Sequence, residues 1–213
     1  FFKAGRKQRV IPNPAVSRLN GDAIRHNSDK GNIVSAGRLC RQKNFELLIK
    51  AYQESLPFLD DRKLIIYGEG ELKERLQNLI RSYGLESRVS LSGNVIDFTS
   101  IDDGGSIFVL SSIREGIPNA LVEAMISGYA CISTDCRPGG PAWLSDNGRR
   151  VCIVPMNDVD ALSQAIVKVA NDEEYRSQLV SNSKEILEIC NPDRIGKMWM
   201  NLINEVLNES KRC

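Results

Sequence analysis

The stretch NIVSAGRLCRQKNFELLIKAY, residues 32–52, decides the fold class of this chain. It starts with a short apolar run, passes through a basic turn, and continues into a segment with helical spacing of its apolar side chains. These are Phe45, Leu48, Ile49 and Tyr52, which we expect to lie in the core. A buried strand, a turn and an amphipathic helix form the repeating unit of a parallel sheet covered by helices. We therefore expect an α/β fold.

The same alternation continues through the rest of the chain. Apolar runs that predict strands recur at 32–36, 64–67, 88–91, 106–110, 130–133 and 151–154. Segments with helical spacing occupy 44–55, 72–83, 118–127, 158–169, 173–189 and 192–207. Several strands are apolar without alternation, which indicates that both faces of the sheet are covered. The expected architecture is a Rossmann-like parallel sheet with helices on both faces, over residues 31–213.

Residues 1–30 do not fit that alternation. The opening FFKAGRKQRVIPNP looks like the tail of a missing N-terminal domain, and the polar stretch at 20–30 like an interdomain linker. Val10 and Ile11, followed by two prolines, predict a short extended piece that ends in a turn. We expect a boundary near residue 30 between this segment and the α/β domain.

Composition excludes several classes of protein. Of the 213 residues, 42% are hydrophobic and 26% are charged, which is typical of a soluble globular protein. The net charge of +1 supplies no field for a nucleic-acid partner. Six scattered cysteines without a CxxC pair are expected to be reduced, and His26 has no partners for zinc. Without a bilayer-length apolar run or a leader, we expect a cytoplasmic protein.

Two loops after predicted strands suit a nucleotide diphosphate. Gly37 permits a tight turn after the first strand, and Arg38 and Lys43 place two cations around the next helix start. Arginine can fork onto phosphate oxygens, lysine acts as a point charge, and the helix N-terminus adds free amides. After the third strand, the backbone of the turn Gly93–Val95 can approach a flat base. Taken alone, these loops are equally an ordinary basic helix start and an ordinary turn.

The loop after the fourth predicted strand reads SSIREGIPNALVEA, residues 111–124. Pro118 is expected to open a helix, with the free amides of its first turn facing a phosphate. Glu115 is expected at the mouth of the cleft, where it can accept hydrogen bonds from sugar hydroxyls. Glu123, on the helix, can accept from the two ribose hydroxyls. The alternative is that both glutamates are solvated charges that flank a core helix.

These motifs resemble those of a known family. Glu115 and Glu123 in EGIPNALVE resemble the signature of retaining glycosyltransferases of family 4. GRLCRQKN, LIIYGEGEL, SGNV, SSIREGIPNALVEAM and NDVDALSQAI are similar to motifs of that family, in the family's order, over about 32–170. VIPNP resembles the family's crossing between its two domains. The resemblance implies the C-terminal, nucleotide-sugar-binding half of a GT-B fold.

The resemblance also implies roles for individual residues. Arg38 and Lys43 would bind the donor diphosphate, Val95 the base through its backbone, and Glu123 the ribose. Glu115 and the backbone that follows it would hold the transferred sugar, and Glu115, Arg38 and Lys43 would be the catalytic residues. The complete expected donor site comprises Gly37, Arg38, Lys43, Val95, Glu115, Gly116, Ile117, Pro118, Asn119, Ala120 and Glu123.

The implied reaction transfers a hexose or N-acetylhexosamine, with retention, from a nucleotide sugar to a saccharide or lipid-linked acceptor. A UDP-sugar is preferred over a GDP-sugar, and the nucleotide sugar is a substrate, so neither cofactor nor metal is expected. The departing diphosphate would help to deprotonate the acceptor. The missing N-terminal domain would supply acceptor-side residues and a peripheral attachment at the inner face of the plasma membrane, for polysaccharide or glycoconjugate assembly.

The chain departs from the family pattern at two positions. Trp143 stands where the family usually has a glutamate, and Val151 replaces a glycine that is common before the last strand. The first of these differences could reshape the loop on the phosphate side of the site.

Three alternatives compete with sugar transfer. A dehydrogenase would use YGEGELKE, but Lys73 stands where the third glycine of that motif belongs. Asp158 and Asp160 form a DxD pair that a metal could use, although capping of the next helix accounts for them better. The third alternative is a nucleotide-binding module without catalytic activity.

Overall fold

The computed structural model describes residues 10–15, 31–97, 101 and 104–210, with the side chains of 209 and 210 excepted. Six parallel strands form one sheet in the order β3-β2-β1-β4-β5-β6. The predicted strands are all confirmed, with ends within about one residue of those expected. Their bounds are β1 Asn32–Ala36, β2 Leu64–Tyr67, β3 Val89–Leu91, β4 Gly105–Leu110, β5 Ala130–Thr134 and β6 Val151–Val154.

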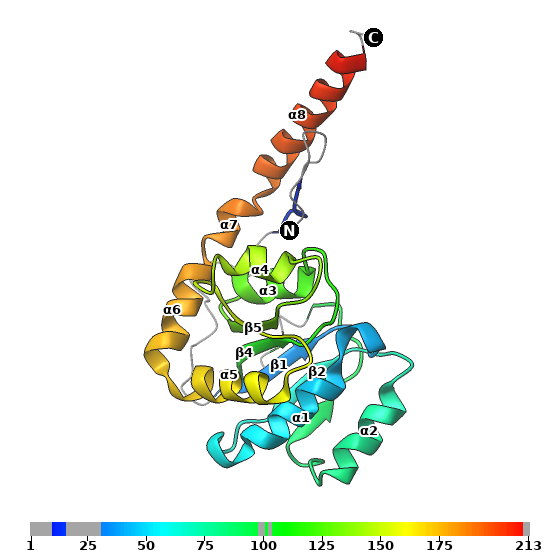
Figure 1. Ribbon diagram of the computed structural model, residues 1–213, viewed down its shortest axis with the longest axis vertical. Coiled ribbons are helices and arrows are strands. Elements are labelled where there is room, and N and C mark those ends of the chain that lie inside the picture. The colour runs from blue at the N-terminus through cyan, green and yellow to red at the C-terminus, as the bar shows by residue number, and fades with distance from the viewer. Residues whose placement is uncertain (1–9, 16–30, 98–100, 102–103, 211–213) are drawn as a thin grey trace.

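Helices connect the strands and follow the last one (Figure 1). The α-helices are α1 Phe45–Ser55, α2 Lys73–Ser82, α3 Asn119–Ile126, α4 Gly140–Ser145, α5 Val159–Asn171, α6 Glu173–Ser183, α7 Ile186–Ile189 and α8 Pro192–Ser210. Two 3₁₀ turns, η1 Arg41–Lys43 and η2 Leu56–Phe58, flank α1.

Three expectations about helices were wrong. The helix expected over 173–189 is divided into α6 and α7, because the end of α6 is held on β6 while Ile186 turns into the core. Hydrogen bonds from Asn182 and Ser183 to the carbonyls of residues 149 and 150 hold it there. Helix α4 was missed, since its Gly-Gly-Pro start is typical of a turn. Pro118 is the N-cap of α3 rather than its first helical residue.

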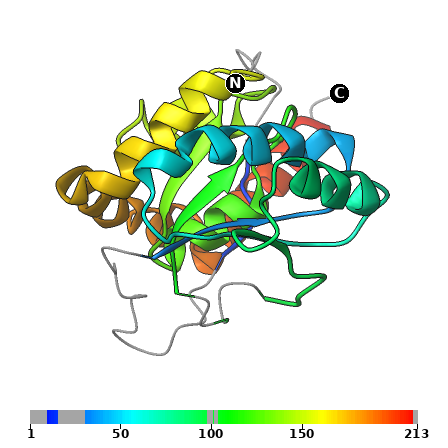
Figure 2. The ribbon, with the colours of Figure 1, turned by 90° about the horizontal axis from the view of Figure 1, so that it is seen from below.

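Two apolar cores lie on opposite faces of the sheet, as the sequence predicted. Ile33 of β1 packs with α1, α2 and α5, whereas its neighbour Val34 packs with α3, α4 and α7. Figure 2 shows α1, α2 and α5 together over one face. Every residue of β4 and β5 is buried. The predicted stripe on α1 is confirmed as core, with Phe45 3% exposed and Leu48, Ile49 and Tyr52 fully buried.

Strand order determines where a ligand can bind. From β1 the chain proceeds outward through β2 and β3, then returns to the other side of β1 and proceeds through β4 to β6. The loops after β1 and β4 therefore separate at a topological switch point, where open α/β sheets bind their ligands.

Helix α8 extends away from the sheet (Figure 1). Of its expected apolar side, Ile195 is buried, but Trp199 is 50% and Ile203 46% exposed. Residues 10–15 are described, and the backbone N–H of Ala15 donates to Cys190 O at 2.8 Å. The rest of the predicted tail and linker at 1–30 lies outside the described residues. In the described part of the chain, no helix has the length and apolar character to cross a membrane.

Candidate active site

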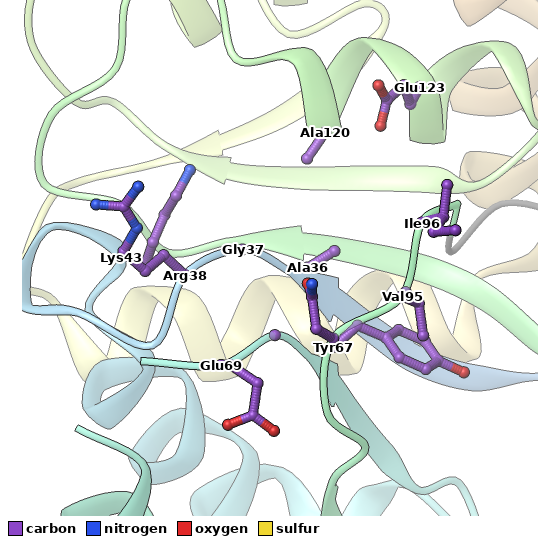
Figure 3. Close-up of a pocket in the computed structure, with 12 residues that line it drawn as sticks. Ala36, Gly37, Arg38, Lys43, Tyr67, Glu69, Val95, Ile96, Ala120 and Glu123 are labelled. Carbon is purple, nitrogen blue, oxygen red and sulfur yellow. The ribbon is translucent and has the colours of Figure 1, made fainter. Parts of the chain in front are cut away.

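A cavity of about 420 Å³ opens at the C-terminal ends of the central strands (Figure 3). Six residues of the expected donor site line it: Gly37, Arg38, Lys43, Val95, Ala120 and Glu123. Figure 3 shows the side chains of Arg38 and Lys43 on one side of this cavity and the Glu123 carboxylate on another. Two cations and a carboxylate therefore share one space about as large as a small-molecule site.

The loops after β1 and β4 are joined by hydrogen bonds. The Gln42 side chain donates to Arg114 O at 2.8 Å, and the Ile113 amide donates to Gln42 O at 2.9 Å. The buried Ser111 hydroxyl donates to Lys43 O at 2.8 Å. The backbone that carries Lys43 is thus fixed against the end of β4.

Lys43 and Glu115 form an ion pair across these loops, with Lys43 Nζ 2.6 Å from Glu115 Oε1. The side chains are 18% and 11% exposed, so water screens the pair less than a surface pair. The Ser112 hydroxyl donates to the same oxygen at 2.9 Å. Glu115 does not line the cavity itself and is connected to it through Lys43.

The loop after Glu115 packs against α4. The Glu115 amide donates to Arg137 O at 2.8 Å. A Cβ at Gly140 would lie 1.4 Å from the Gly116 carbonyl oxygen, so this contact requires glycine. The expected sugar-binding backbone is consequently held by residues 137–140, which no sequence motif connected with it.

Helix α3 presents both its N-terminus and Glu123 to the site. The Pro118 carbonyl accepts from the amides of Leu121 and Val122, and the earlier amides of Asn119 and Ala120 belong to the unpaired first turn. Ala120 and the exposed Glu123 line the cavity, whereas Leu121, Val122 and Met125 are buried. The helix is therefore a core element with one polar edge on the cavity.

Ile117 and Asn119 lie elsewhere, in a neighbouring cavity of about 170 Å³ that they share with Glu123. There the Asn13 side chain donates to the Asn119 side-chain oxygen at 3.0 Å. Neither Gly116 nor Pro118 lines the larger cavity. The expected site is thus divided between a cavity at Arg38 and Glu123 and a loop beside it.

Sequence reasoning missed part of the cavity wall. The end of β2 and the turn after β3 contribute further lining residues, which with Ala36 are Tyr67, Gly68, Glu69, Asn94 and Ile96. A Cβ at Gly68 would lie 1.9 Å from Gly37 O, so the loops after β1 and β2 touch through backbone. Because β2 lies between β3 and β1, the loop after β2 belongs beside the other two. Strand order was the signal that could have found it.

The acidic pair at 158 and 160 caps α5. Asp158 is the N-cap, and its carboxylate accepts from the Ala161 amide at 2.9 Å, which confirms the capping interpretation. Among the residues that the structure describes, no group of three or more His, Cys, Asp or Glu residues is arranged to hold a metal ion.

The two departures from the family pattern lie away from the larger cavity. Val151 is fully buried at the start of β6, opposite Cys131, where a branched side chain fills the core. Trp143 is 38% exposed on α4 and is not part of the lining of the larger cavity.

The five cysteines within the described ranges are free, as expected. Burial, assisted by the charge of Glu115, raises the pKa of Cys136 to about 11. This thiol therefore stays protonated at neutral pH beside the Glu115 loop.

Comparison with known proteins agrees with this geometry. The chain is 30% identical over 182 residues to the GalNAc-alpha-(1->4)-GalNAc-alpha-(1->3)-diNAcBac-PP-undecaprenol alpha-1,4-N-acetyl-D-galactosaminyltransferase of Campylobacter jejuni, covering 84% of this chain and 50% of that protein. The chain thus spans half the length of that curated relative.

Solved structures show the same fold. TarM of S. aureus, in a complex with UDP, superposes with a TM-score of 0.75 at 24% identity, covering 82% of this chain and 36% of that one. The C-terminal domain of a group 1 family glycosyl transferase, LpcC, from Francisella tularensis gives a TM-score of 0.64 at 20% identity, covering 74% and 84%. The fold is therefore that of a Rossmann-like domain of GT-B glycosyltransferases. The model of the family "Glycosyl transferases group 1" matches residues 18–186, so this chain belongs to the group 1 glycosyl transferases.

Proposed function

We propose that this chain is the donor-binding half of a retaining, metal-independent glycosyltransferase that uses a UDP-sugar. One observation carries the proposal: Arg38, Lys43 and the N-terminus of α3 share a cavity with the Glu123 carboxylate. Cations and free amides suit a diphosphate, and a carboxylate suits ribose hydroxyls. The UDP in the complex of TarM supports the choice of base.

Each side of the site has a part in the proposed reaction. Arg38 and Lys43 neutralise the charge that develops on the departing diphosphate, which lowers the barrier most in a site shielded from water. Glu123 holds the ribose, and the backbone at Val95 lies against the base. Glu115 accepts hydrogen bonds from hydroxyls of the transferred hexose or N-acetylhexosamine.

The transfer breaks the bond between sugar C1 and a diphosphate oxygen and forms a bond from C1 to the acceptor oxygen on the same face. The acceptor hydroxyl proton moves to an oxygen of the departing diphosphate. No side chain of the protein acts as a nucleophile in this scheme, and no metal is needed because the cations and amides carry the charge.

The acceptor is proposed to be a saccharide or lipid-linked saccharide, bound by a second domain. The name of the C. jejuni relative contains such a lipid-linked saccharide, and that protein is twice as long as the part this chain matches. Without the second domain the chain binds donor but transfers poorly, because positioning of the acceptor contributes ~7 to 11 kcal/mol to such reactions. We place the enzyme in the cytoplasm, at the inner face of the plasma membrane, in polysaccharide or glycoconjugate assembly.

Calorimetric titration with UDP, GDP and NAD in the presence of a chelator tests the proposal. We expect saturable UDP binding that is lost in the double variant Arg38→Ala, Lys43→Ala. The matched control is Lys50→Ala, Lys63→Ala, which removes the same charge from exposed positions outside the cavity. Preference for GDP would change the donor, and preference for NAD or absence of nucleotide binding would overturn the proposal.

A further inference from the structure

The buried hydroxyl of Ser112 is tied to the one carboxylate of the site that does not line the cavity. Ser112 is 1% exposed, and its Oγ donates to Glu115 Oε1 at 2.9 Å. The hydroxyl of the fully buried Thr134, on β5, donates to the Ser112 carbonyl at 2.6 Å. A side chain that no ligand reaches is thus fixed from the neighbouring strand and directed at Glu115.

Glu115 is held from two sides. Lys43 Nζ and Ser112 Oγ both donate to Oε1, at 2.6 and 2.9 Å. Oε2 takes part in neither bond and is the oxygen that remains for a ligand hydroxyl. The two donors differ in one respect, because Lys43 lines the cavity and Ser112 does not.

This difference matters when a donor binds. A diphosphate in the cavity carries more negative charge than one carboxylate and competes with Glu115 for the ammonium group of Lys43. The ammonium has three N–H donors and can turn towards the phosphate. The Ser112 hydroxyl has no phosphate within its reach and keeps its bond to Oε1.

We propose that Ser112 is a positioning residue that holds the Glu115 carboxylate towards the transferred sugar while the donor diphosphate engages Lys43. The proposal rests on the proposed function of the same cavity. Ser112 contributes nothing to UDP itself, which lacks the sugar, and acts on UDP-sugars through Glu115.

The test compares the affinities for UDP and for UDP-sugars. Titration of the wild-type chain with UDP-glucose, UDP-galactose, UDP-N-acetylglucosamine and UDP-N-acetylgalactosamine identifies the donor that binds best. In Ser112→Ala we expect the Kd of that donor to rise about tenfold, the size of a lost hydrogen bond to a charged group, while the Kd of UDP stays within about twofold. A general loss of structure would weaken both ligands together.

Two controls separate positioning from stability. Ser35→Ala removes an equally buried hydroxyl, which donates to Val109 O at 2.6 Å, and should change neither Kd. In a Glu115→Ala background, Ser112→Ala should have no further effect, because its route to the sugar is already gone. Ser112→Cys keeps the size with a weaker donor and replaces Ser112→Ala if the alanine variant does not fold.

An unchanged Kd for the UDP-sugar in Ser112→Ala would overturn the positioning role. So would an equal loss for UDP and UDP-sugar, or an undiminished effect of Ser112→Ala in the Glu115→Ala background. A wild-type chain that binds neither UDP nor GDP overturns the proposed function instead, which keeps the two failures distinct.

Discussion

The loop at 111–118 and the helix α3 that follows it carry the two signature carboxylates, and the two are held in different ways. The Glu115 side chain is 11% exposed and is fixed by Lys43 and Ser112, while its loop packs on Gly140. Glu123 projects from an exposed position of α3, a helix whose opposite side lies in the core. A spacing of seven residues therefore joins a position that needs tertiary support to one that needs only a helix. The comparison predicts that perturbations reach the two carboxylates separately.

The largest expected effect comes from Gly140→Ala, which should damage the loop and leave α3 in place. The new Cβ would lie 1.4 Å from Gly116 O, so the backbone must move, and we expect a loss of roughly 3 kcal/mol in the free energy of unfolding. Urea denaturation measures it, with Gly196→Ala in α8 as the control, because a Cβ there meets nothing within 4 Å. Equal stability of the two variants would show that the loop does not depend on this packing.

Glu123→Ala should have the next largest effect, on binding alone. Loss of hydrogen bonds from ribose hydroxyls to a charged group is expected to weaken UDP affinity by roughly 1.5 to 3 kcal/mol, about tenfold to a hundredfold. The side chain is exposed, so the unfolding midpoint should barely change. Calorimetry with UDP measures the loss, and Glu115→Ala is the comparison, since it should spare UDP. The same loss in both variants would contradict the division of labour between loop and helix.

The smallest effect is expected far from both carboxylates, at Glu185. Hydrogen bonds from Arg149 and then Arg150 hold the pKa of Glu185 at about 2. Because this pKa is below the unfolded value of ~4.3, the stabilisation is present above pH ~4.3 and is lost as pH falls towards 2. Glu185 is solvent-exposed, so Glu185→Gln should flatten the acid limb of the stability curve only slightly and leave UDP binding unchanged. Thermal unfolding between pH 2 and 6 measures it, and a steeper acid limb would be the opposite of this expectation.

Sequence patterns predicted the strands and most helices because local signals there agree with the global fold. Apolar runs marked strands buried on both faces, and the stripe that begins at Phe45 marked the side of α1 that enters the core. They failed where tertiary contacts overrode local signals. Ile186 enters the core and breaks a predicted helix after Ser183, and a Gly-Gly-Pro turn continues as α4.

The candidate site was only partly predictable for the same reason. Arg38, Lys43 and Glu123 stand in motifs that are contiguous in sequence, and they line one cavity. Tyr67, Glu69 and the contact between Gly140 and Gly116 depend on which loops become neighbours. That information is contained in the order of the strands, which no short motif encodes.

The amino-acid sequence by itself determined the α/β class, the strand positions and the residues of the family signature, because spacing and hydrophobicity are local properties. Only the tertiary structure decided that Lys43 and Ser112 share one oxygen of Glu115, and that Glu115 stands beside the cavity rather than in its wall. Such contacts join side chains from different loops, and their geometry is set by strand pairing and by the packing of helices on both faces of the sheet.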